Sequence, residues 1–177
     1  MCEAAFQAPM GRRAWLRTLL ATGCALQAAV PAQGRALRLE PPGPRDTCPV
    51  CGMFVARYPY WVATVQWRDG KRVHFDGAKD FFKYLFDLPR YEKGRARSDI
   101  SAMGVTDFYA TELIDAASAW YVIGSDVLGP MGHELVPHAS QAEAREFMTD
   151  HKGRRVLRFA EVTASLPAEL DAGRFPR

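Results

Sequence analysis

The sequence lacks the features on which several common functions depend. Its 177 residues carry a net charge of only +3, and no basic run is interleaved with aromatic residues, which argues against a nucleic-acid partner. The apolar stretch at residues 18–30 is too short to span a membrane. No acid–base pair and no activated nucleophile stand out, so we expect a binding protein and not an enzyme.

The first 34 residues are typical of an export signal and not of a folded segment. Basic residues precede the apolar stretch (Arg12, Arg13 and Arg17), and residues 32–34 fit a cleavage site. The paired arginines, followed by an aromatic residue and a leucine, favour a twin-arginine signal over a Sec signal. Residues 20–24 form a poor lipobox, which makes lipid anchoring to a membrane the alternative. Each route exports the protein, and we expect it in the periplasm.

Cysteine is scarce, and this scarcity restricts the site that the chain can build. Two of the four cysteines fall in the predicted signal, so Cys48 and Cys51 remain after cleavage. Two thiols in an oxidising compartment form a disulfide, a metal site or a redox pair. A structural zinc site needs four ligands, and the sequence has neither a second cysteine pair nor a His-x-x-x-His pair, which disfavours zinc.

Periodic patterns after residue 60 predict an α+β fold. Strands are expected at residues 61–67, 71–75, 100–105, 111–114, 120–124, 134–136 and 156–162, and helices at residues 77–85 and 140–150. The order strand, glycine turn, strand, helix, strand occurs twice, over residues 61–105 and 119–162. We therefore predict two related small ββαβ units that share a core or pack side by side, since each alone is very small.

These patterns also predict the divisions of the chain and the helix caps. The divisions are an export signal (1–34), a proline-rich arm (35–47), a first ββαβ unit (48–110), a second ββαβ unit (111–163) and a weakly ordered tail (164–177). Asp76 is expected to cap the first helix. Ser140 is expected to cap the second helix, in a capping box with Glu143.

The motif CPVCGM at residues 48–53 carries the sharpest chemical signal. A Cys-x-x-Cys turn aims two thiols at one ion. The thioether of Met53 is a poor ligand for zinc and a good one for copper(I). If residues 51–55 are extended, Cys51 and Met53 point to the same side of the chain. The motif therefore favours a copper(I) site.

A second methionine lies in the turn GPMG at residues 129–132. Such a turn is normally exposed and polar, so the large apolar side chain of Met131 either fills a core or is displayed for use. Beside Cys51 and Met53, it becomes a candidate third soft ligand. His133, two residues further on, could also reach a metal ion.

Two other interpretations of these residues stay open. The spacing of Cys48 and Cys51 is that of thiol–disulfide oxidoreductases, although in those enzymes the motif opens a helix, and here Gly52 and strand-like residues follow it. The pair could also belong to an interaction module stabilised by zinc or by a disulfide. For Met53, burial in the core is the commoner role of a methionine.

A series of short motifs resembles the NosL family. The motifs are CPVCGM, Pro59-Tyr60-Trp61, Asp69-Gly70, Phe75-Asp76, residues 119–126 (AWYVIGSD), the GPMG turn, and a closing helix followed by Gly153 and Val156. Together they span residues 46–162. Each motif is weak alone, but their order and combination are specific.

The resemblance implies a copper(I)-binding metallochaperone, periplasmic or lipid-anchored, with two related ββαβ units. It also implies copper delivery toward nitrous oxide reductase, together with a membrane ABC-type maturation complex. The family's Cys-x-Met element maps onto Cys51 and Met53, and the methionine of its GPMG turn maps onto Met131. Cys48 is present in only part of the family. We expect copper(I) at Cys48, Cys51, Met53 and Met131.

Overall fold

The computed structural model describes residues 37–176. The predicted export signal lies outside these residues. None of the helices in the described part of the chain combines the length and the apolarity needed to cross a bilayer.

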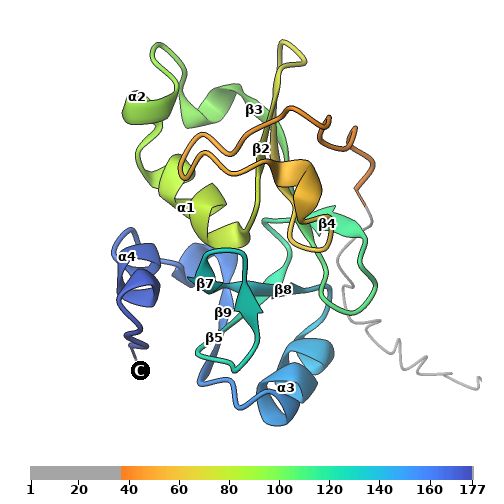
Figure 1. Ribbon diagram of the computed structural model, residues 1–177, viewed down its shortest axis with the longest axis vertical. Helices are drawn as coiled ribbons and strands as arrows, with labels where there is room; N and C mark the ends of the chain where they lie inside the picture. Colours follow the sequence, from red (N-terminus) through yellow and green to blue (C-terminus); the bar gives the residue numbers. More distant parts are fainter. Residues whose placement is uncertain (1–36, 177) are drawn as a thin grey trace, which may run out of the picture. The chain divides into compact units, whose positions relative to one another are not determined.

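The described strands form three antiparallel sheets (Figure 1). The first sheet has the order β2 (Arg72–Phe75), β1 (Ala63–Trp67), β3 (Ile100–Thr106) and β4 (Leu113–Asp115). The second has the order β8 (Val136–His138), β5 (Trp120–Ile123) and β9 (Arg155–Arg158). The third is the hairpin of β6 (Leu128–Gly129) and β7 (Gly132–His133), whose turn contains Met131.

Four α-helices and three short 3-10 helices complete the described chain. The α-helices are α1 (Ala78–Phe86), α2 (Leu88–Tyr91), α3 (Gln141–Asp150) and α4 (Leu166–Asp171). The 3-10 helices are η1 (Val55–Arg57), η2 (Arg97–Asp99) and η3 (Phe159–Glu161). The predicted α+β class is therefore confirmed.

The two larger sheets share one connectivity. In each, an inner strand comes first, a later strand pairs with it on one side, a helix follows, and a further strand pairs with the inner strand on its other side; in the second sheet the β6–β7 hairpin is inserted between the first two of these strands. In the first sheet these elements are β1, β2, α1 and β3; in the second they are β5, β8, α3 and β9. The unit boundary at residues 110 and 111 stays a prediction, and β4, which follows it, pairs with β3.

Helix α1 supplies the centre of the core because its apolar residues recur at helical spacing. The rings of Phe81 and Tyr84 pack edge-on against Phe75 at the end of β2, with centroids 5.9 and 5.0 Å away. On the other side, Phe82 contacts Tyr121 of β5 at 5.2 Å. One continuous core therefore includes residues of both sheets and of α1, which contacts both.

Several local predictions from the sequence are wrong, among them the strand at residues 156–162, which ends at Arg158 and is followed by η3. The segment after residue 164 is not weakly ordered, because α4 buries Leu166 and Leu170 in the core. The strand expected at residues 134–136 begins at Val136 instead. Asp76 does not cap the first helix: the N-cap is Gly77, with no side-chain cap.

Candidate metal site

The CPVCGM segment forms a tight turn closed by backbone hydrogen bonds. The Cys48 amide donates to the Met53 carbonyl at 2.9 Å, and the Gly52 amide donates to the Cys48 carbonyl at 2.8 Å. An antiparallel bridge between Thr47 and Phe54 continues this closure. Gly52 has φ +80, a left-handed conformation that glycine adopts without steric cost. The turn therefore fixes the two cysteines relative to each other.

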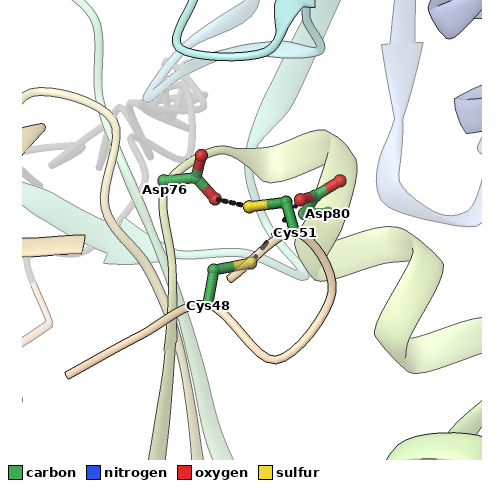
Figure 2. Close-up of side chains that lie close together, drawn as sticks. All are labelled: Cys48, Cys51, Asp76 and Asp80. Atoms are coloured by element: carbon green, nitrogen blue, oxygen red, sulfur yellow. Dashed lines mark hydrogen bonds between the residues drawn. The ribbon is translucent and has the colours of Figure 1, made fainter. Parts of the chain in front are cut away.

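Both thiols face carboxylates at the start of α1 (Figure 2). Cys51 Sγ donates to Asp76 Oδ1 at 3.2 Å, and Cys48 Sγ donates to Asp80 Oδ2 at 3.5 Å. One ligand atom from each of the four residues lies within 4.8 Å of the others. Among the described residues, this is the one group of three or more His, Cys, Asp or Glu side chains that could hold a metal ion.

Burial at the site is uneven, and this sets its open side. Cys48, Asp76 and Asp80 are each 1% exposed, whereas Cys51 is half-buried. The solvent-accessible side of the group of four is therefore the side of Cys51. An ion in this position would be held near the surface and would remain accessible from one side.

The protonated form of both thiols is favoured. Burial raises the pKa of Cys48 well above its ordinary value. Burial, with hydrogen bonds to Asp76 and Asp80, raises the pKa of Cys51 to about 12. Because a buried carboxylate repels a neighbouring thiolate, the metal-free site holds its two sulfurs as thiols. A bound ion must displace those protons.

Met53 belongs to the same turn, but the extended conformation predicted for residues 51–55 is wrong. Residues 51–55 are not extended, since Gly52 is left-handed and η1 begins at Val55. Strand-like alternation therefore does not relate Cys51 to Met53. Met53 is half-buried, and its carbonyl closes the cysteine turn.

Met131 is displayed and does not fill the core. It is 43% exposed at the tip of the β6–β7 hairpin. Its carbonyl accepts a hydrogen bond of 2.7 Å from Nζ of Lys79, the residue before Asp80 on α1. The tip of the hairpin thus contacts the same end of α1 that faces the cysteines. The ring of His133 packs against Phe175 at 4.8 Å and is not part of the group of four.

Glu134 fastens the hairpin to the start of α1. It is buried, and its Oε2 accepts from the amides of Lys79, at 2.8 Å, and Leu135, at 3.2 Å. A β-carbon at Gly77 or Gly129 would collide with the Glu134 side chain. The two glycines therefore let the hairpin lie directly against the N-terminus of α1.

Neither carboxylate of the site is among the ligands predicted from the sequence. The sequence pattern predicts Asp76 as a helix cap and assigns no role to Asp80. One signal was present: the two residues are four apart at the start of a predicted helix, a spacing that places side chains as neighbours. What the pattern alone could not supply is the long-range packing of the cysteine turn, 25 or more residues earlier, on this end of α1.

Comparison with known proteins identifies the family. The NosL family profile matches residues 41–167. The copper-binding lipoprotein NosL of Stutzerimonas stutzeri is 32% identical over 132 residues, which cover 70% of this chain and 65% of that protein. The chain thus spans less than two thirds of that relative's length. The crystal structure of the copper chaperone NosL from Shewanella denitrificans has the same fold, with a TM-score of 0.61 at 23% identity, over 72% of this chain and 97% of that chain. The chain belongs to the NosL family.

Proposed function

We propose that this protein carries one copper(I) ion and delivers it to a copper-requiring acceptor. The observation that carries the proposal is the turn in which Cys48 and Cys51 place two thiols in one group of ligand atoms, with one of them half-buried. Thiolates and thioethers are the ligands that copper(I) prefers. A carrier needs a firm site that another protein's ligand can still enter, and the exposure of Cys51 provides that access.

The proposed ligands are the two thiolates and two thioethers, those of Met53 and Met131. We expect Cys51 to supply most of the affinity, because burial raises its pKa less than that of Cys48 and its thiolate therefore forms more readily. Met53 follows it by two residues, and Met131 comes from a hairpin tip that contacts α1. The thioethers are uncharged, so they add soft ligands without adding negative charge beside Asp76 and Asp80.

The proposed setting follows from the family and its members. A copper-binding lipoprotein and a copper chaperone are among the proteins that this chain resembles. We place the mature protein in the periplasm, free or lipid-anchored. Its proposed acceptor is nitrous oxide reductase, served together with a membrane ABC-type maturation complex.

Copper titration of the reduced mature protein against a copper(I)-specific chelator tests the proposal. The expected result is one copper(I) per chain, held far more tightly than one zinc ion under the same conditions. The matched control is Cys48→Ser/Cys51→Ser, which keeps the size of both side chains and removes both thiolates. Equal chelator competition by the wild type and this control would overturn the proposal.

A second candidate function has one observation in its favour. Asp76 and Asp80 supply the two ligands that a zinc site would otherwise lack, so Cys48 and Cys51 could form with them a four-ligand site for a divalent ion. Such an ion would stabilise an interaction module. Zinc bound more tightly than copper(I), with a higher unfolding temperature, would favour this candidate.

The thiol–disulfide oxidoreductase is less well supported. Its attacking cysteine needs a lowered pKa, because the thiolate is the nucleophile. Here burial raises the pKa of both thiols, that of Cys51 to about 12. The motif also lies in a turn followed by η1, not at the start of an α-helix.

A further inference from the structure

Polar contacts at the candidate site extend beyond the four clustered residues to the last helix. Asp80, which accepts from Cys48, also pairs through Oδ1 with Lys83 Nζ at 3.0 Å. The same Lys83 ammonium lies 2.8 Å from Oδ2 of Asp171, on α4. These contacts link the cysteine turn, through Asp80 and Lys83, to helix α4.

The other oxygen of Asp171 leads to the methionine hairpin. Asp171 Oδ1 lies 2.9 Å from Lys79 Nζ, which in turn donates to the Met131 carbonyl at 2.7 Å. One carboxylate therefore joins two lysines that hold opposite halves of the candidate site. Helix α4 packs on both α1 and β7, which agrees with this bridging position (Figure 1).

The burial of Lys79 makes this link consequential. Its side chain is fully buried, and a buried ammonium is costly unless it is paired and hydrogen-bonded. The Met131 carbonyl and the Asp171 carboxylate both contact this ammonium. Loss of the carboxylate would change where the ammonium points, and the Met131 turn depends on that ammonium.

We propose that Asp171 is a positioning residue that sets the Met131 turn against the cysteine turn, so that the thioether of Met131 is presented to the bound ion. This inference rests on the proposed function. Asp171 lies after residue 167, where the match to the family ends. It is 42% exposed, and the docking of α4 depends on the buried side chains of Leu166 and Leu170. Asp171→Asn is therefore expected to fold.

The test is a double-mutant cycle between Asp171→Asn and Met131→Leu, read as copper(I) affinity by chelator competition. Asp171→Asn should weaken copper(I) binding about tenfold when Met131 is present, and less than about twofold in the Met131→Leu background. Asp171→Glu, which keeps the charge, should restore part of the loss. A purely structural role would lower the affinity equally in both backgrounds, which would overturn the inference, as would no loss in either.

A copper-free measurement separates this inference from the proposed function. Methyl NMR of the apo protein should show the Met131 signal shifted in Asp171→Asn and unchanged in Asp126→Asn. Asp126 is the matched control, because it is 45% exposed and pairs with Lys152 at 3.1 Å. An unmoved Met131 signal in Asp171→Asn would overturn the positioning role. A Met131 signal that shifts in Asp171→Asn, together with a wild-type protein that binds no copper(I), would support the positioning contact and refute the proposed cargo.

Discussion

The sulfur of Cys51 lies 3.2 Å from Oδ1 of Asp76, so the more accessible thiol of the site donates to a buried carboxylate. This contact stabilises the thiol and opposes the thiolate, which is the form that binds metal. The carboxylate can therefore act in two ways. It can hold the empty site protonated, or it can serve as a ligand itself, and the two roles give opposite results on substitution.

Asp76→Asn should raise the affinity for copper(I) at pH 7 by several-fold, because the neutral amide no longer disfavours the Cys51 thiolate. The affinity for zinc should fall, since a carboxylate is a better zinc ligand than an amide. Chelator competition with each metal measures both. The exposed Asp69, paired with Arg95, provides a control in Asp69→Asn. Weaker copper(I) binding in Asp76→Asn would make Asp76 a ligand.

Cys51→Ser should abolish tight copper(I) binding, because a hydroxyl is a poor ligand for a soft ion. Cys48→Ser should weaken binding less, since Cys48 is buried and its thiol faces Asp80. Copper(I) affinities of the two single variants, measured against the same chelator, check this order. Equal losses would mean that the two thiolates act as a pair and that the ranking is wrong.

The sequence predicted the elements of the fold better than it predicted how the site is assembled. The hairpin at Gly70, the helix that follows, and the capping box of Ser140 and Glu143 are local features, and the structure confirms them. The final helix α4 was missed because its order comes from burying Leu166 and Leu170, not from helix length or caps.

The site depends on contacts that local patterns do not encode. Cysteine spacing predicted that Cys48 and Cys51 would lie together, since they occupy one turn. The approach of that turn to Asp76 and Asp80 depends on how the chain before β1 packs on α1. Local patterns also cannot predict the position of the Met131 hairpin relative to α1, because this position depends on the buried contacts of Lys79 and Glu134.

In air and without copper, Cys48 and Cys51 should form a disulfide that blocks metal uptake. Both sulfurs lie in one group with ligand atoms within 4.8 Å of one another, and molecular oxygen would be the oxidant. Mass measurement after thiol alkylation should find both cysteines unmodified in the oxidised protein and both alkylated after reduction. Bound copper(I) should protect both thiols from this oxidation. Free thiols in the oxidised, metal-free protein would contradict the prediction.

His138 should make the protein acid-sensitive. Burial lowers its pKa from 6.5 to about 4, so as the pH falls through this window the unfolded chain takes up a proton that the folded chain does not. The stability present above pH 6.5 is therefore lost toward pH 4, by up to about 3 kcal/mol. Denaturant unfolding at several pH values measures this loss.

His138→Leu should flatten that loss. Within residues 37–176, neither ring nitrogen of His138 has a hydrogen-bond partner, so an apolar side chain there should cost little at pH 7. Glu134 changes the stability in the opposite sense. Burial raises its pKa from 4.5 to about 8, so the stability that it contributes at low pH is lost as the pH rises through this range. The difference between wild type and His138→Leu isolates the histidine. Parallel stability curves would exclude His138 as the cause.

Met131→Leu tests whether the hairpin tip supplies a ligand. Leucine keeps the bulk and the apolar character, and the contact with Lys79 is made by the backbone carbonyl, so the apo fold should be unchanged. Since Met131 is 43% exposed, its side chain contributes little to the core.

If the thioether binds copper(I), the affinity of Met131→Leu for copper(I) should fall clearly, by about tenfold or more, while the unfolding midpoint of the apo protein stays the same. Met148→Leu, a substitution of a half-buried methionine on α3, is the matched control and should leave the affinity unaltered. A loss of affinity in Met131→Leu alone would mean that an acceptor can open the site by displacing one uncharged ligand at the hairpin tip, without first competing for either thiolate. Wild-type affinity in Met131→Leu would remove Met131 from the site and leave the cysteine turn to hold the ion.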